Sequence, residues 1–241
     1  MEPTKRRIVA ITMAASLVIV MLAAAARAQF WAQKEKEEWS QMDCQQMLRN
    51  SPWSAQVLSV MDPNEISLVG AARPRITYVV QLWSAKPVRM AMARNVHFDP
   101  RILAMSQEQR EQMLADARGF IDENYDDAIV VHVVYGANLP GTHKDLLFFW
   151  GSQKPETIKD LVTLAGPRGR IVLKEVTGKF SGRDEMEITF PRRVNGKALL
   201  EPGDESFRLE IACPRFKNVP AHRATVEFSA AKMMFGGKLE Y

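Results

Sequence analysis

The chain has 241 residues, of which 46% are hydrophobic and 25% are charged, as is ordinary for a globular protein with one sizeable core. The first 28 residues hold four basic residues and one acidic residue, and the remainder holds 28 basic and 27 acidic residues. A nucleic-acid-binding domain concentrates its basic residues on one face, and no such concentration is visible here. The pI of about 9.1 therefore does not indicate a nucleic-acid partner.

The N-terminus, residues 1–28, has the layout of a secretory signal peptide. Three basic residues precede an uncharged apolar run of about 19 residues, which ends in an Ala-x-Ala cleavage site at 26–28. Cleavage there leaves Gln29 first. The run is also long enough to span a bilayer, so an uncleaved anchor in the inner membrane is the alternative. Both place residues 29–241 outside the cytoplasm, periplasmic or secreted, and only the anchor brings the protein to a membrane.

The sequence contains two cysteines, Cys44 and Cys213. Outside the cytoplasm they can form a disulfide. The loop of roughly 170 residues that this disulfide would close is worth about 5 kcal/mol in the chain-entropy model. The sequence does not show that the two Cα atoms come within bonding distance, so two separate buried thiols are the alternative.

Residues 29–50 are predicted to form a charged spacer and a short helix, and residues 51–241 a single domain. Ser40 and Asp43 have the spacing of a helix N-cap pair. A proline stops this helix, and Trp53 follows at once. A large aromatic side chain at this point indicates an anchor in the core, or alternatively an aromatic platform for a ligand.

Two further helices are predicted in the first half of the domain. Pro87 suits the first turn of a helix over 87–96. Ser106 and Gln109 form a capping box, and apolar residues at helical spacing then predict a helix over 106–123.

Runs rich in β-branched and aromatic residues predict strands over 53–61 and over 75–85, which contains Trp83. The apolar run at 128–136 predicts a central strand that is buried on both sides. His132 lies inside this run. A histidine on an apolar strand is most simply a neutral core residue, and a catalytic base is the alternative.

The apolar run at 145–151 is also predicted to be a strand. Leu146, Phe148 and Trp150 would then share one face. If that face is exposed, it is an apolar patch that binds a partner. If both faces are buried, the run belongs to the core.

Most of the remaining sequence predicts closely spaced strands, with a turn at Asn195-Gly196. The run at 185–192 alternates apolar and polar residues, which predicts a strand with one buried face. Strands are expected at 157–166, 170–178, 185–192, 206–213, 224–230 and in the tail 233–241.

These elements together predict an α+β fold. It is mainly an antiparallel, sandwich-like domain of about nine strands, with two inserted helices and a short N-terminal helix.

The motifs of well-known catalytic and cofactor sites are missing from the sequence. There is no H-E-x-x-H, C-x-x-C, G-x-S-x-G or phosphate-binding glycine loop. We therefore expect no catalytic residue, no metal site and no cofactor.

Several stretches resemble an uncharacterised family of secreted acidobacterial proteins. They are SPWSAQV at 51–57, SAKPVRMAMAR at 84–94, FPRRVNGKALLEPGDESFRLE at 190–210 and GGKLEY at the end. The resemblance covers most of the chain after the leader, in the same order. It implies a single exported domain and no assigned activity.

The sequence supports three hypotheses about function. The first is an exported, non-enzymatic domain that binds a protein or envelope partner. The second is a secreted hydrolase whose site is assembled from distant residues such as His132. The third is a small-ligand binder that uses Trp53, Trp83 or Trp150.

Overall fold

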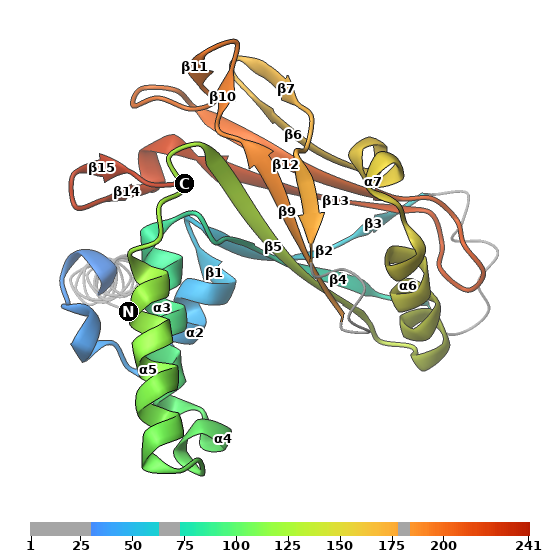
Figure 1. The fold of residues 1–241 in the computed structure, drawn as a ribbon. Helices are drawn as coiled ribbons and strands as arrows, with labels where there is room; N and C mark the ends of the chain where they lie inside the picture. The colour runs from blue at the N-terminus through green and yellow to red at the C-terminus, as the bar shows by residue number, and fades with distance from the viewer. Residues whose placement is uncertain (1–29, 63–72, 178–183) are drawn as a thin grey trace, which may run out of the picture. The chain divides into compact units, whose positions relative to one another are not determined.

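The computed structural model describes residues 30–62, 73–177 and 184–241 (Figure 1). The chain divides into two compact units, Met1–Glu38 and Trp39–Tyr241. The expected signal peptide lies outside the described residues. The described part of the first unit forms two single-turn 3-10 helices, η1 at Phe30–Ala32 and η2 at Lys36–Glu38.

The second unit contains a six-stranded sheet in the order β1-β2-β4-β5-β9-β8, in which all neighbours pair antiparallel. The strand β5 occupies an interior position, as its continuous apolar sequence predicts. The six strands are β1 Asn50–Ser51, β2 Ser54–Leu58, β4 Ile76–Leu82, β5 Ala128–Ala137, β8 Glu175–Thr177 and β9 Glu185–Pro191.

One face of this sheet is buried along β4, β5 and β9. The register places Tyr78 opposite Tyr135 and Val133 opposite Met186, so large apolar side chains from neighbouring strands lie side by side. Strand β9 buries its even-numbered residues, which confirms the alternation predicted at 185–192. The buried residues on this face are Ile76, Tyr78, Val80, Leu82, Ile129, Val131, Val133, Tyr135, Met186, Ile188 and Phe190.

A second, five-stranded sheet has the order β3-β13-β12-β6-β7, again antiparallel throughout. Its longest strands bury every second residue, which leaves one apolar and one solvent-facing side. The strands are β3 Val60–Met61, β6 Val162–Gly166, β7 Gly169–Ile171, β12 Ser206–Cys213 and β13 His222–Ser229.

The apolar faces of the two sheets pack together. A hydrogen bond of 2.8 Å between the Tyr78 hydroxyl on β4 and Nε2 of His222 on β13 joins them through the core. Helices cover other parts of the unit. The architecture is therefore an α+β fold with a sandwich-like arrangement, as the sequence predicts.

Three helices gather at one end of the unit (Figure 1). Capping boxes at Ser40 and Ser106 start the first and the last of them, which confirms both predicted helix starts. The short helix α4 at Pro100–Leu103 precedes the last one. The three helices are α2 Gln41–Arg49, α3 Lys86–Asn95 and α5 Gln107–Ile121.

The strand predicted at 145–151 is wrong, because this run lies within helix α6, Pro140–Ser152. Leu146, Phe149 and Trp150 are buried at helical spacing, whereas Phe148 is 58% exposed. An apolar run of this length suits a buried helix as well as a strand, and packing decides between them.

The strand predicted at 157–166 is also partly wrong. Its first half forms helix α7, Pro155–Leu161, and only its second half forms β6. Within the described part of the chain, no helix combines the length and the apolar character needed to cross a membrane.

Two small hairpins complete the unit. Asn195 and Gly196 have φ values of 51° and 80°, so the predicted turn connects β10 and β11 in the conformation that favours Asn-Gly. The tail forms a hairpin rather than a single strand. The four short strands are β10 Arg193–Val194, β11 Lys197–Ala198, β14 Met234–Phe235 and β15 Lys238–Leu239.

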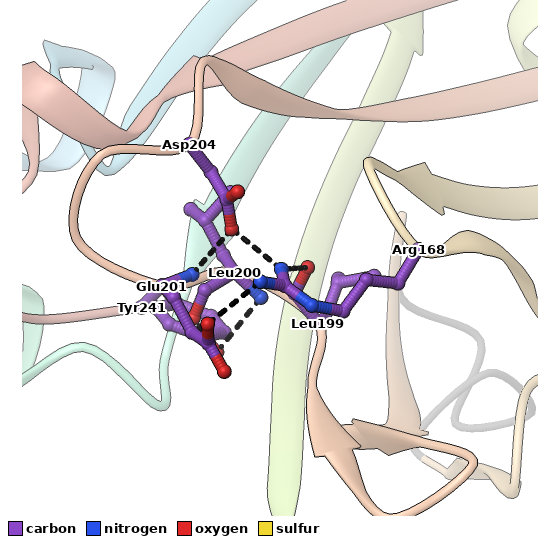
Figure 2. Close-up of polar contacts among 6 residues, drawn as sticks. All are labelled: Arg168, Leu199, Leu200, Glu201, Asp204 and Tyr241. Carbon is purple, nitrogen blue, oxygen red and sulfur yellow. Dashed lines mark hydrogen bonds and ion pairs between the residues drawn. The ribbon is translucent and has the colours of Figure 1, made fainter.

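An arginine cluster ties three distant segments together (Figure 2). Arg168, in the turn between β6 and β7, contacts Asp204 at 2.5 Å and Glu201 at 2.8 Å. The Tyr241 hydroxyl donates to the Leu200 carbonyl at 2.8 Å and accepts from the Leu200 amide at 3.2 Å. The Arg168, Glu201, Asp204 and Tyr241 side chains are thus engaged within the protein, and we interpret this cluster as structural.

Candidate functional site

Two of the tryptophans singled out by the sequence lie in the core. Trp53 and Trp150 are completely buried. The indole nitrogen of Trp53 donates to the Glu240 carbonyl at 2.8 Å, and the Trp150 ring lies 6.2 Å from the ring of Tyr135. Neither indole offers a face to a ligand, so Trp53 acts as the core anchor that its position indicates.

The other two candidates, Trp83 and His132, lie together on the opposite face of the six-stranded sheet. Their rings stack with centroids 4.0 Å apart and planes 15° apart. Nε2 of His132 lies 3.4 Å from Oε2 of Glu185 on the neighbouring strand. The structure therefore assembles an indole, an imidazole and a carboxylate that are separated by about fifty residues at each step of the sequence.

Trp83 is held at its indole and at its main chain. Its Nε1 donates to Oε1 of Gln81 at 3.0 Å, and Gln81 donates in turn to the Leu48 carbonyl of α2 at 2.8 Å. The buried Arg89 of α3 donates to the main-chain carbonyl of Trp83 at 3.0 Å. These contacts position the indole over the histidine.

His132 is only 7% exposed. Burial lowers its pKa despite the opposing influence of Glu185, so the imidazole is neutral near pH 7. Nε2 faces Glu185, and among the described residues Nδ1 is buried without a hydrogen-bond partner. With one ring face under Trp83, this histidine has the surroundings of a core residue rather than of a general base.

The cysteines are both free and buried in this structure, so the candidate disulfide between Cys44 and Cys213 is not formed. Cys44 lies on α2, and Cys213 ends β12 in the other sheet. Burial raises the pKa of Cys44 to about 11 and that of Cys213 to about 12. Both are protonated thiols near pH 7, which is the second alternative that the sequence left open.

A pocket of about 760 Å³ opens where the chain passes from one sheet to the other. The amide of Ser59 still donates to the Ile76 carbonyl of the first sheet, at 2.9 Å. The next two residues pair with β13 of the second sheet, Val60 with Arg223 and Met61 with His222. The pocket lies beside this crossing of the chain, and we call it the corner pocket.

The lining of the corner pocket is mainly apolar, with a few polar groups. Leu58 and Val60 are 58% and 73% exposed and together give the rim of the pocket an apolar patch. Cys213, only 2% exposed, is also among the lining residues. The lining residues are Val57, Leu58, Val60, Met61, Asp62, Leu161, Ala212, Cys213, Pro214, Ala221, His222, Arg223 and Thr225.

His222, one of the lining residues, carries a fixed, neutral imidazole. Its Nδ1 lies 2.8 Å from the Pro220 carbonyl, which can only accept, so Nδ1 carries the proton. Nε2 then accepts from the Tyr78 hydroxyl at 2.8 Å. Burial lowers the pKa of His222, in keeping with this neutral form. Both ring nitrogens are engaged within the protein, so neither is available to a ligand.

His222 was missed by the sequence reasoning, although a signal for it exists. It begins the alternation that buries Ala224, Val226 and Phe228 of β13, so it belongs to the buried face. Pro220, two residues earlier, argues against a strand at this point, so the strand was predicted to begin only at residue 224. The pocket itself has no sequence signature, because its walls come from four separate segments.

The described residues contain no group of three or more His, Cys, Asp or Glu side chains arranged to hold a metal ion. No family model, no curated protein and no solved structure matches the chain.

Proposed function

We propose that the protein is an exported binding domain whose corner pocket holds an amphipathic small molecule, with an acyl-like apolar body and one anionic end. The observation that carries this proposal is the pocket itself, about 760 Å³ in volume and lined mainly by apolar side chains. This volume lies in the range of small-molecule sites. The N-terminal leader layout supports export.

The exposed apolar side chains at the pocket supply the driving force. Leu58 and Val60 are more than half exposed in this structure. Covering the two side chains with a ligand is worth about 2–3 kcal/mol together, by the usual value for burying such groups. An apolar ligand body satisfies this surface, whereas a fully polar ligand does not.

The polar end of the ligand is assigned from the charged residues of the lining. Among the described lining residues the charged side chains are Asp62 and Arg223, and the guanidinium of Arg223 is 61% exposed. Its Nη1 lies 3.0 Å from Oε1 of Glu210, so a ligand anion shares the guanidinium with this carboxylate. A bidentate guanidinium suits a carboxylate or phosphate end group.

The hydrolase hypothesis receives less support from the geometry. A general base needs a ring nitrogen within reach of a substrate. The nitrogens of His222 are engaged by Tyr78 and Pro220, and those of His132 face Glu185 or are buried. A binding role is therefore favoured over a catalytic one.

The test is titration of the full chain with a dansylated undecanoic acid, which has an acyl body, a carboxylate and a fluorescence response. We expect binding in the micromolar range, and we expect V60D to weaken it at least about tenfold, because a carboxylate then faces the acyl chain. The control is V172D, since Val172 is 64% exposed and does not line the pocket.

A second reading locates the probe. Arg223 lines the corner pocket and is assigned to the anionic end, so R223Q should weaken binding of the probe, whereas R208Q, at an exposed arginine of the same sheet outside the lining, should not. Equal affinities of wild type, V60D and V172D, or of wild type and R223Q, would reject the pocket as the site.

A further inference from the structure

An aromatic pair with one exposed and one half-buried ring lies at the surface of α6. The rings of Phe148 and Phe216 stack with centroids 5.9 Å apart and planes 12° apart. Nζ of Lys217 lies 4.4 Å from the Phe148 ring and 5.1 Å from the Phe216 ring. Phe148 is 58% exposed, so its ring can contact a partner surface.

The loop that carries Phe216 is held rigidly. Phe216 and Val219 exchange backbone hydrogen bonds of 2.9 and 2.8 Å, so Lys217 and Asn218 form a two-residue hairpin loop. The side chain of Asn218 donates to Asp145 of α6 at 2.7 Å. The loop is therefore fastened to the helix, and the nearest acidic side chain is engaged.

Lys217 occupies an unfavourable backbone position. Its φ is 49°, in the left-handed region where glycine is preferred in such loops. A lysine at this position gains nothing for the turn itself. What it does provide is an ammonium group directly above two aromatic rings, one of them exposed.

Other cations surround the aromatic pair. Lys144 lies one helical turn before Phe148 on the same face of α6 and is exposed. Arg215 precedes Phe216 and is exposed as well. We call the five residues Lys144, Phe148, Arg215, Phe216 and Lys217 the aromatic–basic patch.

We propose that the aromatic–basic patch binds an anionic membrane surface. Exposed aromatic rings favour the interfacial layer of a bilayer, and flanking lysine and arginine side chains reach the lipid phosphates. Anionic lipid complements the three cations, which is why we favour a membrane over an apolar protein surface. This inference does not depend on the pocket ligand.

The patch and the corner pocket share one loop. Residues 214–221 connect β12 to β13, and Pro214 and Ala221 line the pocket while Phe216 and Lys217 belong to the patch. A membrane bound at the patch therefore lies next to the pocket. Helix α6 lies at the opposite end of the unit from α2, α3 and α5, which leaves those helices away from the lipid (Figure 1).

The test places a reporter inside the patch. Full chains carrying F148W, and L103W as the control at an exposed apolar residue of α4, are mixed with vesicles of equal parts phosphatidylglycerol and brominated phosphatidylcholine. We expect F148W to gain bromine quenching over wild type and L103W to gain none. Any binding through the N-terminal leader is common to all three proteins and cancels.

Charge variants give the second measurement. K144Q and K217Q should each weaken sedimentation with phosphatidylglycerol vesicles about fivefold, and neither should alter the small amount bound to pure phosphatidylcholine. Equal quenching in F148W and L103W would overturn the proposal. Charge variants that bind the vesicles like wild type would overturn it as well. So would a third result, in which K144Q and K217Q also lose heparin binding while F148S binds vesicles normally, because the patch would then be a general polyanion-binding surface.

Discussion

The two buried histidines show how similar side chains can serve different regions of one molecule. His132 and His222 lie on long strands, are 7% and 5% exposed, and both have a pKa that burial lowers. An aromatic ring lies beside each, Trp83 at 4.0 Å and Tyr78 at 5.8 Å.

Their surroundings differ in what lies in front of the ring. The imidazole of His132 is covered by an indole and faces a carboxylate, so its region is closed. The imidazole of His222 has both nitrogens engaged and still borders the corner pocket, so its region is open. Burial and a lowered pKa alone therefore do not identify a binding site. The presence of a pocket that a ligand can enter does.

Removing the Trp83 indole should open the region around His132 to water. We expect W83A to lower the free energy of unfolding by about 3 kcal/mol, because a large, partly buried side chain and its stacking are lost. The pKa of His132 should rise, since the ring then meets water. Urea unfolding and histidine NMR titration measure the two effects.

W83F is the matched control, because it keeps an aromatic ring over the histidine. It should retain most of the stability and leave the pKa of His132 lowered. If W83A leaves this pKa unchanged, the indole is not what excludes water from His132, and the comparison fails.

The hydrogen bond between Tyr78 and His222 can be tested by comparing Tyr78 with Tyr135, which lies opposite it in the sheet. Y78F should cost about 1–2 kcal/mol, because Nε2 of His222 then loses its donor in a buried place. Y135F should cost little or nothing, since among the described residues the Tyr135 hydroxyl has no hydrogen-bond partner.

Both changes remove one buried hydroxyl from neighbouring strands, so cavity and transfer effects cancel in the difference between them. Equal costs, measured by urea unfolding, would contradict the assigned hydrogen bond between the sheets.

The smallest expected effect concerns pH. The pKa values of both histidines, and of His97, are lowered in the folded chain, so the unfolded chain takes up protons first as pH falls below about 6.5. Stability is therefore full above that pH and decreases towards pH 5. The measurement is Tm at pH 7 and at pH 5.

H132Q and H222Q should each reduce this decrease, whatever they do to the Tm itself. The carboxyl of Asp99, whose pKa is about 2, acts in a lower pH range, because its stabilisation is lost only below about pH 4. A Tm that is unchanged between pH 7 and pH 5 in wild type would contradict the neutral burial of the histidines.

The sequence predicts elements well where one local rule decides. The alternation in β9 and the capping boxes at Ser40 and Ser106 each appear in the structure as expected. These features depend on residues a few positions apart. Patterns of this kind need no tertiary information.

It fails where tertiary packing decides between two local readings. The apolar run at 145–151 fits a strand by composition, yet Pro140 starts a helix whose buried residues recur at helical spacing. The stacking of Trp83 on His132 depends on strand pairing, and the corner pocket on where the chain crosses from one sheet to the other. Neither arrangement is encoded in a short stretch of sequence.

The passage of the chain between the sheets has a consequence for how the protein opens. The segment 54–61 contributes β2 to one sheet and β3 to the other, with only Ser59 between them. Neither sheet can lose this strand without pulling on its counterpart. The amide of Asp62 donates to the Ala221 carbonyl of the second sheet at 3.0 Å, as that of Ser59 does to Ile76 of the first. We therefore expect the amide hydrogens of Ser59 and Asp62 to exchange with solvent in one cooperative event.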